Sequence, residues 1–136
     1  IQPFIQNDQK GPFVLCLTSN ISASDLQFSK KGDDTLYEYV AKLSVKLNTR
    51  NNIGLVVGAT NTTQMESLRK ISPNLSWLIP GIGVQGGDLE ASITIGNKNG
   101  VGIVNVSRGI LYAGDGGLNA IVKSAQNYTS KIKSFL

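Results

Sequence analysis

Residues Trp77–Asp88 read WLIPGIGVQGGD, where a short apolar run passes directly into a loop that contains four glycines. The apolar part, Trp77–Pro80, suits a strand that is buried on both faces, as in a parallel sheet. Three further runs of this kind recur along the chain, at Phe13–Leu17, Ile53–Val57 and Gly102–Val106. The four runs predict four neighbouring parallel strands.

Segments with helical periodicity separate and follow these runs. The first has one apolar stripe and Asp33 or Asp34 as its expected N-cap; the stripe consists of Leu36, Tyr39, Val40, Leu43 and Leu47. Three more helices are expected: from Asn61 or Thr62 to Pro73, with Met65, Leu68 and Ile71 on one face; from about Asp88; and after Gly116-Gly117, with Leu118, Ile121, Val122, Ala125, Tyr128 and Ile132.

The alternation of strands and helices predicts an α/β fold made of four consecutive βα units with right-handed crossovers. No linker or repeat divides the chain, so residues 1–136 are expected to form a single segment. Eight such units make a (β/α)8 TIM barrel, and four would be half of one. An open doubly wound sheet is the alternative.

Composition excludes several classes of function. The net charge of +4 is scattered rather than gathered in a basic stripe, which argues against nucleic-acid binding. No apolar run approaches the roughly 20 residues that cross a bilayer, and no signal peptide is visible, so a cytoplasmic protein is expected. The single cysteine, Cys16, is expected to be a buried strand residue, and it permits no internal disulfide. The absence of histidine removes His-dependent nucleophile systems and most zinc sites, and no metal is predicted.

The glycine-rich loop allows two interpretations of a ligand site. Its glycines let the backbone approach a ligand closely, and the amides of the following helix favour an anion. Gly81, Gly83 and Gly86 also match the pattern G-x-G-x-x-G, which would fit an NADP-binding Rossmann-type domain with Arg108 serving the 2'-phosphate. That motif usually opens the first βαβ unit, however, whereas here it follows the third apolar run.

Polar residues follow two other strands. Ser107-Arg108-Gly109 comes after the fourth run, where a guanidinium can grip a phosphate with two hydrogen bonds. TIM barrels commonly bind phosphate with the loops after strands seven and eight, so the two loops would coincide with that site if the chain supplied strands five to eight. Thr18-Ser19-Asn20 follows the first run and could bind a planar amide or imide, although these are also ordinary turn residues.

Together these pieces resemble one family, orotidine 5'-monophosphate (OMP) decarboxylase, and best its longer microbial and protozoan branch. The order and spacing of four blocks match strands five to eight of that family across nearly the whole chain: Val14–Asn20, Gly54–Thr60, Leu78–Asp88 and Val104–Tyr112. One departure is Ile21, which stands where the family usually has proline.

The resemblance implies a homodimeric TIM barrel that converts OMP to UMP and CO2 in pyrimidine biosynthesis without a cofactor. It also implies that the catalytic Lys and Asp residues, in an Asp-x-Lys-x-x-Asp motif, belong to the first half of the barrel. That motif is absent here; the nearest string, Lys30–Asp34, lacks the leading Asp and is expected in a loop. No catalytic residue is therefore assigned to this chain, and its implied partner is the N-terminal half of the same barrel.

The resemblance carries five substrate-binding residues onto this sequence. It implies that Ser19 binds the imide edge of the pyrimidine, that Gln85 bridges toward Ser19 and touches the phosphate, and that Arg108 binds the phosphate. The amides of Ser107 and Arg108 would add donors, and Pro80 would line the apolar side of the base. Another phosphate-binding TIM-barrel enzyme, such as an isomerase or aldolase, remains the alternative, but no acid, base or Schiff-base lysine follows Leu17, Val57 or Val106.

Overall fold

A computed structural model describes residues 1–136 and contains a four-stranded parallel sheet. The strand order is β1 (Phe13–Leu17), β4 (Gly54–Val57), β5 (Ser76–Ile79) and β6 (Gly102–Val104), so that strands consecutive among the predicted four lie side by side. The predicted parallel order is confirmed. β6 ends two residues earlier than expected, because the exposed Asn105 already belongs to the loop.

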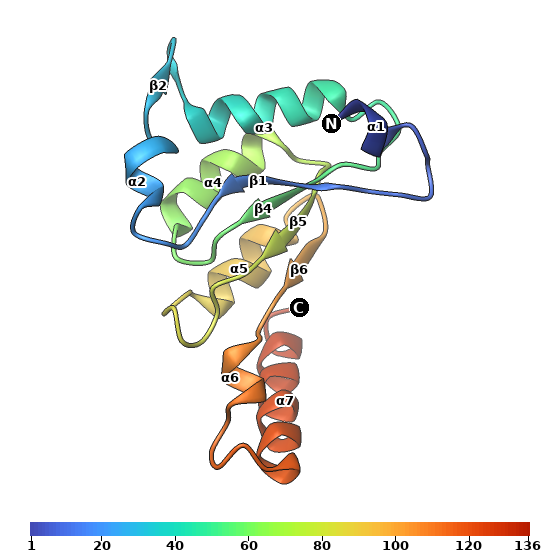
Figure 1. The fold of residues 1–136 in the computed structure, drawn as a ribbon. Coiled ribbons are helices and arrows are strands. Elements are labelled where there is room, and N and C mark those ends of the chain that lie inside the picture. The colour runs from blue at the N-terminus through green and yellow to red at the C-terminus, as the bar shows by residue number, and fades with distance from the viewer.

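A long helix follows each strand of the sheet, as predicted. These helices are α3 (Leu36–Leu47), α4 (Thr62–Ile71), α5 (Leu89–Gly96) and α7 (Leu118–Lys133). Three one-turn helices were not predicted: α1 (Gln2–Ile5), α2 (Ala23–Leu26) and α6 (Arg108–Leu111). β2 (Lys30–Lys31) and β3 (Asp34–Thr35) pair antiparallel where a loop was expected. Figure 1 shows α6 and α7 lying beside each other beyond the carboxyl end of β6.

The expected cap of the first long helix is wrong by one or two residues. Thr35, not Asp33 or Asp34, is the N-cap of α3, because Thr35 and Glu38 form a capping box. The Glu38 carboxylate accepts hydrogen bonds from the Thr35 amide at 2.8 Å and the Thr35 hydroxyl at 2.6 Å. Asp34 instead forms an ion pair with Lys42, with 2.6 Å between Oδ1 and Nζ.

The predicted apolar stripe of this helix also needs correction. The buried residues of α3 are Tyr37, Ala41 and Ser44, whereas Leu43 of the predicted stripe is 41% exposed. Tyr37 lies over β1, where its carbonyl accepts a hydrogen bond from the Cys16 thiol at 3.3 Å. Small side chains on the contacting face let the helix approach the sheet closely, and a count of large apolar residues does not detect them.

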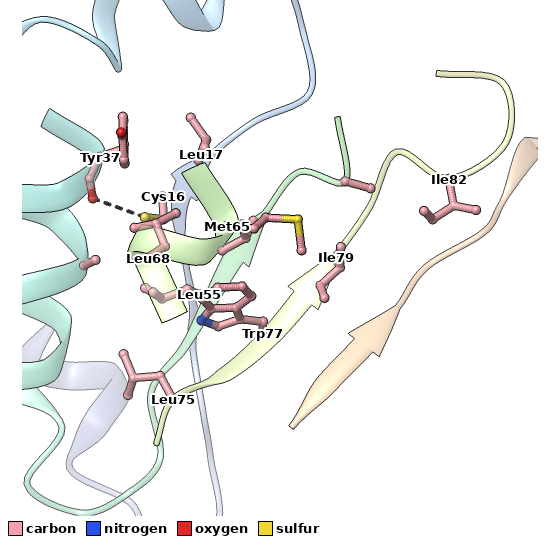
Figure 2. Close-up of a cluster of buried hydrophobic side chains, with 13 residues drawn as sticks. Cys16, Leu17, Tyr37, Leu55, Met65, Leu68, Leu75, Trp77, Ile79 and Ile82 are labelled. Atoms are coloured by element: carbon pink, nitrogen blue, oxygen red, sulfur yellow. Dashed lines mark hydrogen bonds between the residues drawn. The ribbon is translucent and has the colours of Figure 1, made fainter. Parts of the chain in front are cut away.

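The hydrophobic core lies between the sheet and α3, α4 and α5 (Figure 1). Figure 2 shows Met65 and Leu68 of α4 packed near Leu55 of β4 and Trp77 of β5, all of them fully buried. Cys16 is buried as expected. The predicted face of α4 is thus confirmed for Met65 and Leu68, while no residue of α7 is fully buried.

The opposite face of the sheet carries a row of apolar side chains in register. Leu15 pairs with Val56, Val56 with Leu78, and Leu78 with Ile103. The outer members of the row stay accessible, with Leu15 60% and Ile103 45% exposed. Only 25 of the 136 residues are buried, because the long helices that follow β1, β4 and β5 all pack on the other face. β1 and β6, at the two ends of the sheet, each pair on one side only.

None of the helices combines the length and the apolar character that a membrane crossing requires.

Candidate functional site

The loops after the four strands meet at one edge of the sheet, because parallel strands end on the same side. Backbone hydrogen bonds continue past the strand ends and tie these loops together. The Gly58 amide donates to the Leu17 carbonyl at 2.7 Å, and the Ala59 amide to the Pro80 carbonyl at 2.9 Å. The Asn105 amide donates to the Ile79 carbonyl at 3.0 Å, which links the glycine-rich loop to the loop that carries Arg108.

The glycine-rich loop depends on backbone conformations that other residues rarely adopt. Gly81, Gly83 and Gly86 have φ values of 105°, 86° and 75°. The loop folds back on itself, since the Gly87 amide donates to the Gly81 carbonyl at 3.0 Å and the Gly86 amide to the Gly83 carbonyl at 2.8 Å. The repeated glycines are therefore explained by backbone geometry.

The amino end of α5 is already occupied by a carboxylate. Asp88 is the N-cap of α5, and its Oδ1 accepts a hydrogen bond from the Ala91 amide at 2.9 Å. This carboxylate bonds to one of the amides at the helix end that a bound phosphate would also use. The N-cap carboxylate disfavours a second anion at this helix terminus, and the same observation argues against a dinucleotide bound through Gly81, Gly83 and Gly86.

A small pocket lies instead between the glycine-rich loop and the loop after β6. Its volume is about 100 Å³. Its lining contains four of the five residues implied as substrate-binding, together with the neighbouring loop residues: Pro80, Gly81, Ile82, Val84, Gln85, Asn105, Ser107 and Arg108. Gln85, Ser107 and Arg108 are exposed. The amides of Ser107 and Arg108 donate to no acceptor within the chain, so they are free for a ligand.

Ser19, the fifth residue, lies next to this pocket but does not line it. Its hydroxyl is buried and has no hydrogen-bond partner. It contacts the backbone at Gly58 and Gly81, so closely that a methyl group on Gly81 would lie 2.5 Å from Ser19 Oγ. No hydrogen bond joins Ser19 to Gln85. The structure thus brings Ser19 to the glycine-rich loop and leaves its hydroxyl unsatisfied.

Residues that sequence reasoning missed hold the backbone beside Ser19. The Thr18 amide donates to Gln27 Oε1 at 2.9 Å, and Gln27 Nε2 donates to Thr18 Oγ1 at 3.0 Å. From the other side, Asn61 Nδ2 donates to the Thr18 carbonyl at 3.0 Å. Gln27 gave no signal in the sequence, and Asn61 was noted only as a helix cap. Asn61 is that N-cap, but its side chain bonds to the neighbouring loop rather than to its own helix.

The loop after Ser19 forms its turn without the proline that the resemblance led us to expect. The Ala23 amide donates to the Asn20 carbonyl at 3.0 Å, which closes the turn around Ile21. The Ile21 side chain is 96% exposed and contributes nothing to the pocket. Ile21 therefore takes no part in holding Ser19.

The groups that could perform general acid–base chemistry lie away from the pocket. No Lys, Asp or Glu lines it, and no cluster of three or more His, Cys, Asp or Glu side chains exists that could hold a metal ion. Lys30 and Lys31 are exposed in the β2–β3 hairpin, where Lys31 Nζ lies 4.1 Å from the centre of the Tyr39 ring.

A larger hollow of about 240 Å³ lies at the amino ends of β5 and β6 and is lined by Glu66, Arg69, Lys70, Pro73, Lys98 and Asn99. It contains none of the predicted site residues.

Known proteins match this chain closely. The family model described as "Orotidine 5'-phosphate decarboxylase / HUMPS family" matches residues 1–120. An orotidine 5'-phosphate decarboxylase of Dehalococcoides mccartyi is 51% identical over 122 residues, which are 85% of this chain and 45% of that protein. One of Haloarcula marismortui is 46% identical over 116 residues, 85% of this chain and 42% of that protein.

Solved structures agree with the sequence match. The Leishmania donovani OMP decarboxylase superposes with a TM-score of 0.84 and 35% identity, covering 98% of this chain and 51% of that one. The L. donovani UMP synthase gives a TM-score of 0.83 and 38% identity, covering 98% of this chain and 30% of that one. The predicted fold, four consecutive βα units of a TIM barrel, is thereby confirmed, and the chain spans a little under half the length of the curated relatives it matches.

The matched model covers most of the chain and includes all four strands and the loops that line the pocket. The chain therefore belongs to the orotidine 5'-phosphate decarboxylase / HUMPS family.

Proposed function

We propose that this chain supplies the phosphate- and pyrimidine-binding half of an OMP decarboxylase, which converts OMP to UMP and CO2. The observation that carries the proposal is the meeting of Arg108, the free amides of Ser107 and Arg108, and Gln85 around one pocket between two strand ends. A guanidinium beside amide donors that have no acceptor within the chain suits a phosphate dianion.

The proposed phosphate contacts come mainly from the loop after β6. The Arg108 guanidinium can make two parallel hydrogen bonds to phosphate oxygens, and the Ser107 and Arg108 amides add two further donors. Gln85 lines the same pocket from the glycine-rich loop and would donate to the same oxygens. These contacts lie far from the carbon that loses CO2, so their binding energy can serve to organise the site for the transition state.

The proposed pyrimidine contacts lie next to this pocket. The buried Ser19 hydroxyl lacks a partner, and an imide edge offers it both a donor and an acceptor. Pro80, partly buried at the end of β5, would line the apolar side of the base. Gln85 can reach Ser19 only if the exposed glycine-rich loop moves toward it, because the two side chains are not bonded in this structure.

The decarboxylation step itself needs groups that this chain does not place in the pocket. Loss of CO2 leaves a carbanion on the pyrimidine ring, which requires a positive charge beside it. We assign that charge and its carboxylate neighbours to the N-terminal half of the barrel. The accessible row from Leu15 to Ile103 and the unpaired edges of β1 and β6 offer that half an apolar face and two strands to pair with.

We further propose that the complete barrel forms a homodimer and works in the cytoplasm, where a lone free thiol such as Cys16 stays reduced.

The test is to fuse this chain to the half of the L. donovani OMP decarboxylase that it does not cover, and to assay OMP decarboxylation. We call this protein the fused barrel. We expect the fused barrel to produce UMP and CO2 and to sediment as a dimer, and the separate 136-residue chain to produce neither product.

Two results would contradict the proposal. One is turnover by the purified 136-residue chain, which would place the chemistry within it. The other is a folded fused barrel that binds UMP no more tightly than uridine, because the proposed site reads the phosphate. Titration of both ligands by calorimetry separates this second result from a mere failure of the two halves to cooperate in catalysis.

A further inference from the structure

The side chain of Tyr128, on α7, lies against both loops that line the pocket but is not itself part of the lining. A methyl group placed on Gly83 would come within 2.9 Å of the Tyr128 hydroxyl oxygen, and one on Gly109 within 2.8 Å of the same atom. Gly83 belongs to the glycine-rich loop with Gln85, and Gly109 follows Arg108 directly. One hydroxyl therefore touches the backbone of both loops.

A second contact from the same helix holds one of these loops. Ser124 Oγ donates a hydrogen bond to the Gly109 carbonyl at 2.8 Å. Ser124 and Tyr128 are four residues apart on α7 and so lie on the same face of the helix. α7 thus contacts the Arg108 loop at two points and the glycine-rich loop at one.

Glycine at positions 83 and 109 is what allows this contact. Gly83 needs glycine in any case, because its φ is 86°. Gly109 has no such requirement, so its lack of a side chain is explained by the space that the Tyr128 hydroxyl occupies. The next atoms near a methyl group on Gly109 would be Val106 Cγ1 at 3.3 Å and Tyr128 Cε2 at 3.5 Å. These distances are longer, so the Tyr128 hydroxyl is the main obstacle to a side chain at this position.

We propose that Tyr128 is a positioning residue for the phosphate site. It sets the separation between the loop of Gln85 and the loop of Arg108 by packing against the backbone of both. The inference rests on the proposed function, since it takes the pocket between these loops to be the phosphate site. Tyr128 touches no ligand in this account and acts through the backbone at Gly83 and Gly109. A displaced loop would misplace the Arg108 amide and guanidinium together, and small misplacements of such groups are costly.

The test compares UMP and uridine binding to variants of the fused barrel, by calorimetry, with thermal unfolding as the check on folding. Tyr128→Leu should weaken UMP binding about tenfold, the loss expected when positioning contacts are removed, and leave uridine binding unchanged. Tyr112→Leu is the matched control, because the Tyr112 side chain is 77% exposed. The backbone amide of Tyr112, which donates to the Arg108 carbonyl, is kept by the substitution. It should bind both ligands like the parent protein.

A second pair of variants tests the contact between the Tyr128 hydroxyl and Gly109 while keeping the aromatic ring at position 128. Gly109→Ala should weaken UMP binding by about tenfold, because its methyl group meets the Tyr128 hydroxyl. The double variant Gly109→Ala/Tyr128→Phe removes that hydroxyl and should recover binding to within about threefold of Tyr128→Phe alone. A merely structural role of Tyr128 predicts no such recovery.

The outcomes separate the inference from the proposed function. If the parent fused barrel shows no preference for UMP over uridine, the proposed function fails and the inference with it. If that preference is present, the inference is overturned when folded Tyr128→Leu loses affinity for both ligands alike, or when Gly109→Ala and the double variant bind UMP equally well.

Discussion

The guanidinium of Arg69 lies over the indole ring of Trp77, with 3.7 Å between its central carbon and the ring centre. Arg69 is 3% exposed and pairs with no carboxylate. It donates instead to four carbonyls, at the ends of α4 and α5 and before β5: Ser72 at 3.2 Å, Leu75 at 2.8 Å, Ile95 at 3.3 Å, and Gly96. The carboxyl ends of two helices and a ring face thus replace a counter-ion.

Replacing Arg69 with methionine should lower the free energy of unfolding by about 3–5 kcal/mol, because several buried carbonyls lose their donor at once. Burial lowers the pKa of Arg69 to about 10, so the side chain stays charged at neutral pH and no deprotonation complicates the comparison. Urea unfolding of the fused barrel measures the effect. Arg50→Met is the control, since Arg50 forms only an exposed pair with Asp8 and should change stability by less than about 1 kcal/mol. Equal effects of the two substitutions would refute this role for Arg69.

Arg108→Ala should weaken UMP binding to the fused barrel by about 2–5 kcal/mol, through loss of a charge-assisted bidentate contact. Uridine binding should barely change, because the nucleoside lacks the phosphate. The UMP affinity of Arg108→Lys should fall between those of the parent and of Arg108→Ala, since an ammonium keeps the charge but not the planar guanidinium that makes two hydrogen bonds. Calorimetry of both ligands decides the matter, with Arg50→Ala as the control at a distance from the pocket. Losses of the same size for UMP and uridine would show that Arg108 does not read the phosphate.

Thr35→Ala should destabilise the fused barrel by about 1 kcal/mol at neutral pH, the usual cost of losing an N-cap. The hydrogen bonds from the Thr35 hydroxyl and amide hold the pKa of Glu38 below its ordinary value of 4.5. A lowered pKa in the folded state stabilises the protein above pH 4.5, and that contribution disappears as the pH falls through the lowered pKa. In Glu38→Gln the free energy of unfolding should therefore fall less steeply as the pH drops below 4.5. Urea unfolding at several pH values measures this dependence. The exposed Glu66→Gln should leave the loss as steep as in the parent.

Cys16 should react slowly with iodoacetamide at pH 8 while the protein is folded. Burial raises the pKa of its thiol from 9.0 to about 12, which leaves about three orders of magnitude less thiolate than an ordinary cysteine has. Urea should restore ordinary reactivity. Mass spectrometry of the alkylated peptide follows Cys16 specifically in the fused barrel. Alkylation at the same rate with and without urea would mean that the strand carrying Cys16 opens readily or is not packed under α3.

The strand order could be predicted because each strand is a short unbroken apolar run, and such runs between helices admit few topologies. Small elements could not be predicted in the same way. A one-turn helix such as α6 contains too few residues for a periodic pattern, and the β2–β3 hairpin has two residues in each strand. The face of α3 escaped prediction because Ala41 and Ser44, which are small, lie against the sheet in place of Leu43.

Within the candidate site, the sequence indicated residues that stand next to a strand end or a glycine. Arg108 was found from its place after a strand end, whereas Gln85 was assigned only through the resemblance to the family; the structure places both at one pocket. Supporting residues escaped because their contacts follow no helical or strand periodicity and join residues nine or more positions apart. Gln27 bonds to Thr18, and Tyr128 appeared in the sequence only as one apolar position of the last helix, although its hydroxyl meets Gly83 and Gly109.

The free edges of β1 and β6, at opposite ends of one sheet, make this chain bivalent toward any segment that continues the sheet. Once a partner pairs with β1, its far end is tethered near β6, and the second pairing becomes intramolecular with a high effective concentration. Closure should therefore depend steeply on whether one partner can span both edges. Peptides that match a single edge would bind weakly and compete poorly with a segment that reaches both.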